Sequence, residues 1–281
     1  MKRLIPFLLF CIVTTVVQAQ NKMACCSKTD ATDEFAKLAS DKNFVSSHEE
    51  PLPFSFHSDN GKDISFKASD GSDAHGWEIR AKNPSPYWII VIHEWWGLND
   101  YIKRESEKFW NDFGVNVLAV DLYDNKIANT QQDAAAFMQA VKTERAEAII
   151  KGAIAHVGKN AKIFTIGWCF GGGWSLQASL MAGKQAAGCI MYYGMPEKDP
   201  ERLKTLHADV LGIFADQDGF ITPKLVSEFQ ENMKKAGKNL TVHHYDAVHA
   251  FANPSNPKYD KAASEDAYKY LQEFLKARIK K

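Results

Sequence analysis

The sequence has no excess of charge of either sign, since 34 lysines and arginines stand against 34 aspartates and glutamates in 281 residues. Such a balance gives no basis for binding nucleic acid, and no long run of like charges indicates an interaction tail. The chain also lacks internal repeats, low-complexity blocks and any linker after residue 60. With 45% hydrophobic residues it can bury a sizeable core, so we expect one folded domain over residues 61–281.

No apolar run reaches the roughly 20 residues that a membrane-spanning helix needs. The apolar run over residues 4–17 follows Lys2 and Arg3 and precedes the small-residue pattern Val17-Gln18-Ala19. This order is typical of a signal peptide over residues 1–19, cleaved after Ala19. We therefore expect an exported protein, periplasmic or extracellular, with no stable membrane insertion after cleavage. An uncleaved anchor is the alternative.

Cysteine is also scarce, with five in the chain. Cys11 lies in the predicted signal peptide, and the adjacent Cys25 and Cys26 lie in a polar leader that we expect to be flexible over residues 20–60. Cys189 occurs in an apolar run and is expected to be an inert core residue. No disulfide framework emerges, and Cys169 is the cysteine that requires an explanation.

Short apolar runs alternate with helical stretches from residue 62 onward. The runs typical of strands lie at residues 64–68, 76–80, 88–92, 115–120, 163–166, 187–193, 210–215 and 240–245. Helical patterns lie at residues 100–113, 131–141, 144–157, 175–181, 223–236 and 262–279. An early hairpin followed by β-α-β units predicts an α/β fold with a mostly parallel sheet and helices on both faces.

Residues with catalytic chemistry follow several of these strands. Ligands of such sheets bind beyond the carboxyl ends of the strands. The residues found there are Glu94, Cys169, Asp216 or Asp218, and His249. A thiolate is a nucleophile, an imidazole can take its proton, and a carboxylate can orient the imidazole. The two aspartates are equivalent on this reasoning alone.

The stretch GWCFGGG at residues 167–173 joins a predicted strand to a predicted helix. One interpretation is a small buried thiol filling a tight turn. The other is a strained turn that presents Cys169, with glycines that let strand and helix approach closely. In that case the first helical N–H, from Phe170, is directed toward a developing oxyanion. The ordered set of Cys, Asp and His at strand ends favours the second interpretation.

The sequence resembles the dienelactone hydrolases, the cysteine branch of the α/β-hydrolase fold. Four stretches carry the resemblance: residues 93–99 (HEWWGLN), 121–123 (DLY), 167–172 (GWCFGG) and 245–251 (YDAVHAF). The segment ADQDGF at residues 215–220 resembles the one that holds the catalytic acid. The resemblance implies Cys169 as nucleophile, Asp218 as acid and His249 as base. It further implies that Glu94 helps to form the thiolate and that the Trp95 N–H is a second oxyanion donor.

Two departures from the family pattern bear on the substrate. Members that cleave carboxylated lactones bind the carboxylate with arginines, but Asn253 occupies one such position and no arginine occurs between Tyr123 and Arg145. Aromatic residues, namely Trp96, Tyr123 and Trp168, are candidates for an apolar substrate pocket.

These departures favour a neutral substrate. We therefore expect hydrolysis of small esters or lactones through an acyl-cysteine, with no metal or organic cofactor, by a protein that is most simply a monomer. A general carboxylesterase or thioesterase and a non-hydrolytic binding protein on the same fold are the alternatives.

Overall fold

The computed structural model describes Met1 and residues 31–280. The predicted signal peptide beyond Met1, the cysteines at positions 11, 25 and 26, and the first part of the predicted leader lie outside the described residues. None of the helices in the described part of the chain combines the length and the apolar character needed to cross a membrane.

An eight-stranded sheet forms the centre of the described chain, in the order β1-β2-β4-β3-β5-β6-β7-β8. The strands are β1 (Gly61–Lys67), β2 (Asp73–Ile79), β3 (Tyr87–Ile92), β4 (Asn116–Val120), β5 (Lys162–Trp168), β6 (Ala186–Tyr192), β7 (Val210–Ala215) and β8 (Leu240–Tyr245). β1 and β2 form an antiparallel hairpin, β2 pairs antiparallel with β4, and all other pairs are parallel. The predicted fold class is confirmed.

The middle strands are apolar on both faces because helices cover both sides of the sheet. All six residues of β3 (YWIIVI) are buried, as are all six of β7 (VLGIFA). Ile89 in the middle of β3 pairs with Val117 on one side and with Phe164 on the other. Continuous apolar runs of this kind are typical of parallel strands buried between two helical layers.

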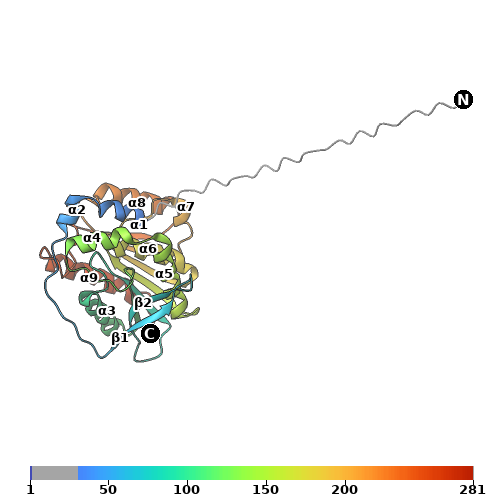
Figure 1. Ribbon diagram of the computed structural model, residues 1–281, viewed down its shortest axis with the longest axis horizontal. Helices are drawn as coiled ribbons and strands as arrows, with labels where there is room; N and C mark the ends of the chain where they lie inside the picture. Colours follow the sequence, from blue (N-terminus) through green and yellow to red (C-terminus); the bar gives the residue numbers. More distant parts are fainter. Residues whose placement is uncertain (2–30, 281) are drawn as a thin grey trace.

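The described helices match predicted helical patterns in six cases, whereas those at residues 31–38, 42–47 and 200–203 were not predicted. They are α1 (Ala31–Leu38), α2 (Lys42–Ser47), α3 (Asp100–Phe113), α4 (Gln131–Ala140), α5 (Thr143–Val157), α6 (Phe170–Ala182), α7 (Pro200–Leu203), α8 (Pro223–Lys235) and α9 (Lys261–Lys276). α3 and α9 lie side by side, with the rings of Phe109 and Tyr268 stacked at 6.3 Å. α5 packs against α6, while α1, α2 and α4 lie together beside them (Figure 1).

The prediction of a flexible leader is wrong for residues 31–48, which form α1 and α2. Asp41 caps α2 by accepting hydrogen bonds from the N–H groups of Asn43, at 2.7 Å, and Phe44. Phe35 and Phe44 are both 0% exposed and belong to the main core. Two aromatic side chains in a polar segment therefore anchor it, and each such burial contributes about 2–3 kcal/mol.

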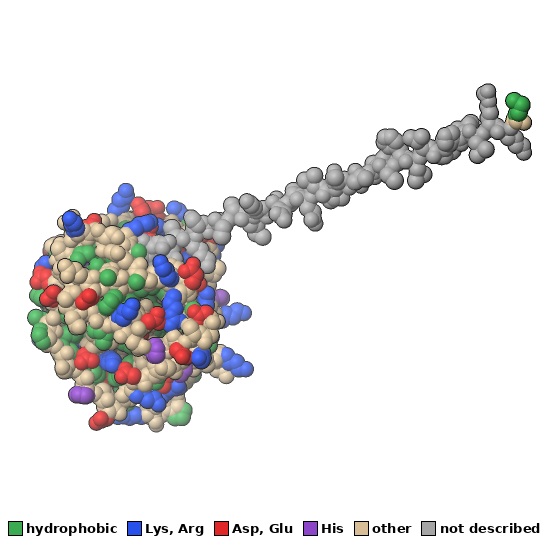
Figure 2. All heavy atoms as spheres, viewed as in Figure 1, with side chains coloured by type: hydrophobic (Ala, Val, Ile, Leu, Met, Phe, Trp, Pro, Cys, Tyr) green, Lys and Arg blue, Asp and Glu red, His purple; other side chains and the backbone are tan. Residues whose placement is uncertain are grey.

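The charged side chains on the visible surface are mixed rather than segregated. Figure 2 shows lysine, arginine, aspartate and glutamate interspersed over the face in view. Most ion pairs among the described residues are exposed, such as Lys67 with Asp73 and Lys204 with Glu201. Exposed pairs contribute little to stability, so the core carries the fold.

Candidate active site

The turn between β5 and α6 holds Cys169 in a strained backbone conformation. β5 ends at Trp168, α6 begins at Phe170, and Cys169 between them has φ +53° and ψ −116°. A residue other than glycine in such a region costs about 1–3 kcal/mol, and such residues cluster at functional sites. The geometry is that of a turn which presents its central side chain.

The glycines around Cys169 are required by the surrounding backbone. A Cβ on Gly167 would lie 2.1 Å from the carbonyl oxygen of Gly171. A Cβ on Gly171 would lie 2.3 Å from the carbonyl oxygen of Ile92 at the end of β3. At Gly173, it would lie 3.2 Å from a ring carbon of Phe35 in α1. The first two glycines allow the turn itself, while Gly173 makes room for the N-terminal segment.

His249 and Asp218 form a buried pair beside the turn. The Nδ1 of His249 lies 2.5 Å from the Oδ2 of Asp218, and the other oxygen of Asp218 accepts N–H bonds from Phe220 and Ile221. Asp216, the other candidate, lies instead 3.0 Å from the exposed His244. The structure therefore brings Asp218, and not Asp216, to the imidazole of His249.

Burial and charge act in opposite directions on this group of side chains. Burial lowers the pKa of His249, but the negative charges of Asp218 and Cys169 outweigh it and raise that pKa well above 6.5. Burial raises the pKa of the Cys169 thiol, and the nearby His249 opposes part of this rise. Burial alone would raise the pKa of Asp218, yet His249 and the two N–H donors hold it below its usual value. The imidazolium form of His249 is thus stabilised next to the thiol.

Glu94, directly after β3, is buried and incompletely paired. Its Oε1 accepts a short hydrogen bond from the Nδ2 of Asn253, and its Oε2 has no partner among the described residues. The amide oxygen of Asn253 is itself held by the N–H and hydroxyl of Ser255, each at 2.8 Å. Burial raises the pKa of Glu94 to about 8, with His249 and Asn253 acting against it. The carboxyl group is therefore largely neutral at pH 7.

Aromatic rings from several elements surround these polar groups. Phe170 is fully buried and lies near the rings of Phe35, His93 and Tyr123. Tyr123 donates a hydrogen bond of 3.3 Å to the carbonyl of Trp95. Trp95 lies edge-on to Trp96, and its indole N–H is buried with no partner among the described residues. Trp95, Trp96, Tyr123 and Phe170 therefore form one apolar wall.

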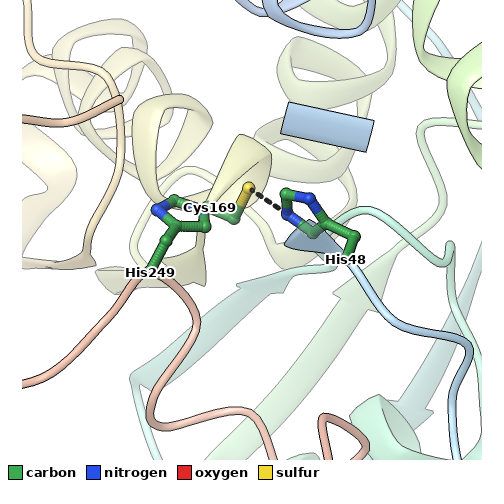
Figure 3. Close-up of side chains that lie close together, drawn as sticks. All are labelled: His48, Cys169 and His249. Carbon is green, nitrogen blue, oxygen red and sulfur yellow. Dashed lines mark hydrogen bonds between the residues drawn. The ribbon is translucent and has the colours of Figure 1, made fainter. Parts of the chain in front are cut away.

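α2 covers this site, which no sequence pattern predicted. Phe44 packs edge-on against Trp95 and Phe220, at ring distances of 5.4 and 4.8 Å. The ring of His48 stacks on Trp95, and its Nε2 lies 3.8 Å from the sulfur of Cys169 (Figure 3). Cys169 is consequently 0% exposed. The aromatic residue three positions after the capping Asp41 was the available signal for this helix.

A cavity of about 350 Å³ lies between α3 and α9 and reaches Glu94 and Asn253. Its inner wall includes Phe109, Trp168 and Tyr192, but neither Cys169 nor His249 lines it. Trp168 stacks on Phe109, whereas Trp96 and Tyr123 lie away from this cavity. The structure thus separates the predicted substrate-contacting aromatics, with Trp168 on the α3–α9 side, Tyr123 beside Phe170 and Trp96 beside Trp95.

Comparison with known sequences finds a matching family and several related proteins. A sequence model of the dienelactone hydrolase family matches residues 76–279. A Saccharolobus solfataricus protein named "Putative carboxymethylenebutenolidase" is 30% identical over 258 residues, covering 75% of this chain and 96% of that protein. Protein usf of Aquifex pyrophilus is 26% identical over 221 residues, covering 73% and 95% of the two chains.

Solved structures show the same fold at low sequence identity. A dienelactone hydrolase-like promiscuous phosphotriesterase from metagenomic libraries superimposes with a TM-score of 0.67 at 18% identity, over 79% of this chain and all of the other. A Pyrococcus furiosus esterase superimposes with a TM-score of 0.61 at 15% identity, over 83% and 99% of the two chains. These matches assign the α/β-hydrolase fold to the chain.

Proposed function

Because this chain belongs to the dienelactone hydrolase family and is a carboxylic ester hydrolase, we propose that it cleaves small neutral esters or lactones through an acyl-cysteine formed on Cys169. The observation that carries the proposal is the Asp218–His249 pair beside a strained cysteine at a strand-to-helix turn. Residues that meet in this way from three strand ends are suited to nucleophilic catalysis.

In the first half of the reaction, the thiolate of Cys169 attacks the substrate carbonyl carbon. The N–H groups of Phe170 and Trp95 are the proposed donors to the oxyanion. His249 then gives its proton to the leaving alkoxide as the carbon–oxygen bond breaks, and the acyl group remains on sulfur. In the second half, His249 takes a proton from water, which attacks the thioester and releases the acid. Asp218 holds the imidazole in the orientation that both steps need.

In the fraction of molecules in which its own carboxyl group is ionised, Glu94 is the proposed acceptor for the thiol proton when His249 is already protonated. The raised pKa of about 8 makes the Glu94 carboxylate a stronger base than an ordinary carboxylate, which lowers the free-energy cost of taking the proton from Cys169. Asn253 fixes the carboxyl group through one oxygen and leaves the other free. In this chain position 253 therefore orients Glu94 instead of binding a substrate carboxylate.

The character of the site favours uncharged acyl groups. The walls near Cys169 are aromatic, including Phe44, Trp95 and Phe220, and Asn253 is neutral. Arg104 lines the α3–α9 cavity but stands over Phe54 and Tyr101 and not over these rings, so a carboxylated lactone beside Cys169 would place an unpaired negative charge among them, which is costly. Neutral aryl or alkyl esters and neutral unsaturated lactones are therefore the proposed substrate class.

A panel of small neutral and carboxylated esters and lactones tests this proposal. We expect wild type to hydrolyse the neutral members faster than their carboxylated analogues. Cys169→Ala should lose activity by about 10⁴-fold or more, because the nucleophile is gone. Cys189→Ala removes the other buried thiol and should retain activity. Equal rates for Cys169→Ala and wild type on every compound would contradict the proposed mechanism.

Export to the periplasm or the medium is a further part of the proposal, and it rests on Lys2, Arg3 and the apolar run that follows them. Expression of the full chain in a Gram-negative host should yield a product that begins after Ala19 and fractionates outside the cytoplasm. A product that retains its first residues in the cytoplasm would contradict this part.

A further inference from the structure

Three side chains with metal-binding atoms converge at the centre of the site. A ring nitrogen of His48, the sulfur of Cys169 and a ring nitrogen of His249 all lie within 4.8 Å of one another, and all three residues are buried. They come from the end of α2, the turn after β5 and the loop after β8 (Figure 3). We propose that these three side chains bind one Zn²⁺ ion, and that zinc reversibly blocks the hydrolase.

The spacing of the donors is close to what zinc requires. Zn–N bonds of about 2.0–2.1 Å and Zn–S bonds of about 2.3 Å place neighbouring tetrahedral donors roughly 3.3–3.6 Å apart. The Sγ of Cys169 already lies 3.8 Å from the Nε2 of His48. The remaining separations reach at most 4.8 Å, so zinc binding requires the donors to approach one another by up to about 1.5 Å. Water can complete the fourth position, as it does in zinc sites with three protein ligands.

Both histidines are oriented as zinc ligands by a second hydrogen bond. The Nδ1 of His48 lies 2.8 Å from the carbonyl oxygen of Phe44, to which it must donate. The Nδ1 of His249 lies 2.5 Å from Asp218. Ligating histidines almost always use their other nitrogen in this manner, since it fixes the tautomer and the ring plane. In both rings Nε2 is thereby the nitrogen that remains for a metal.

The Nε2 of His249 is a further, independent sign of a ligand. It is buried and makes no hydrogen bond of ordinary geometry within the described part of the chain, although it lies near enough to Cys169 for each group to shift the other's pKa. A buried polar nitrogen without a partner costs about 1–3 kcal/mol and calls for an unseen ligand. In the substrate-free protein a ring nitrogen of His249 lies within 4.8 Å of the sulfur of Cys169, where a metal ion can bridge the two atoms. Such an ion would give the unpaired nitrogen a partner.

Zinc at this position would act on the proposed reaction in two ways. It would occupy the sulfur of the nucleophile and the nitrogen of the base, releasing the protons that they carry. It would also link α2 to the turn after β5, so that Phe44 and His48 stay over the thiol. The inhibition, though not the binding, rests on the proposed function.

The test is a zinc titration of the full chain, followed by competition with a chromophoric chelator. Serine replaces the cysteines at positions 11, 25 and 26 in every sample, so that the thiols left are Cys169 and Cys189. We expect one Zn²⁺ per chain. His48→Gln should weaken binding by more than the 10- to 100-fold that loss of an outer partner typically costs. His207→Gln, which changes an exposed histidine, should leave affinity unchanged.

Cobalt provides a spectroscopic signature of the same site. Co²⁺ should give a thiolate charge-transfer band and the intense visible bands of tetrahedral coordination. Cys169→Ser should abolish the charge-transfer band, and Cys189→Ser should retain it. Absence of one-to-one binding, or zinc affinity in His48→Gln equal to that of wild type, would overturn the inference.

Hydrolysis measured with and without zinc keeps the two proposals distinguishable. We expect one equivalent of zinc to inhibit wild type and a chelator to restore its activity, while His48→Gln requires far more zinc for the same inhibition. Hydrolysis with no zinc binding would refute the metal site alone. Zinc binding by a protein that hydrolyses nothing without metal would refute the proposed function alone.

Discussion

The turn at Cys169 and the helix α2 that covers it are built in opposite ways. The turn is fixed by backbone, since a Cβ on Gly167 or Gly171 would lie within 2.3 Å of a carbonyl oxygen. α2 has six residues and is held mainly by the rings of Phe44 and His48 against Trp95. Helices this short have little stability of their own. The nucleophile is thus held by a rigid turn. We expect access to Cys169 to depend on α2, which can open at a low cost in free energy.

The largest expected effect is the difference in activity between substitutions at Asp218 and at Asp216, the two candidates for the catalytic acid. Asp218→Asn should lower kcat/KM roughly 10⁴-fold, because an asparagine no longer stabilises the imidazolium or fixes its tautomer. Asp216→Asn is the matched control, since Asp216 contacts exposed His244 instead. Steady-state kinetics on one aryl ester measures both. A severe loss in Asp216→Asn with a mild one in Asp218→Asn would reverse the assignment.

Glu94→Gln should change the pH dependence of stability. The folded carboxyl has a pKa of about 8 and an ordinary carboxyl has 4.5, so the folded state retains a proton that the unfolded state loses. Wild-type stability therefore falls as the pH rises from 4.5 to about 8. The variant does not titrate there and should exceed wild type by on the order of 3–5 kcal/mol above that window.

Urea unfolding across this pH range measures the difference. The two proteins should converge near the acid end, where the carboxyl is protonated in both states. A constant difference between them at every pH would mean that Glu94 is not buried as a neutral acid.

Gly171→Ala tests the rigid turn directly. The new methyl group would meet the carbonyl oxygens of Ile92 and His93, and neither can move without shifting β3. We expect a loss of about 2–3 kcal/mol in the free energy of unfolding, together with reduced activity. Gly219→Ala adds a methyl where no atom lies within 4 Å and should change the free energy by less than about 0.5 kcal/mol. Equal denaturation midpoints for the two variants would contradict this account of the turn.

Phe44→Ala tests the cover, and its effect should be the smallest. Loss of the ring contacts with Trp95 and Phe220 should favour opening of α2. Alkylation of Cys169 should accelerate by about tenfold, which corresponds to about 1.4 kcal/mol in opening free energy. Alkylation of the buried Cys189 measures global unfolding in the same samples. The control variant is Phe54→Ala, which removes an exposed ring from the stretch that follows α2. Unchanged alkylation of Cys169 would show that α2 does not limit access.

The difference between these regions also explains what the sequence could predict. From residue 61 onward strands and helices alternate regularly, so their order could be predicted from the sequence. The glycines at 167 and 171 could be interpreted in the same way, because a tight turn leaves no room for a side chain at these positions. The chemistry at strand ends followed from the general geometry of parallel sheets.

The cover could not be predicted in the same way. Its two anchors, Phe35 and Phe44, stand among polar residues in short segments, and their partners lie far away in sequence. His48 approaches Cys169 across 121 positions, so no local pattern links them. Which side of the site each aromatic side chain faces also depends on packing. Trp168, for example, is next to Cys169 in sequence but faces the α3–α9 cavity.

The most direct test of the central claim is to trap the acyl-enzyme. Wild type is mixed with a slowly deacylating neutral aryl ester, quenched within the first turnover and analysed by intact mass and peptide mapping. We predict one acyl group per chain, on the peptide that contains Cys169, and the same adduct in Cys189→Ala. An acyl group on another residue, or product release with no adduct and unchanged rates in Cys169→Ala, would contradict the account.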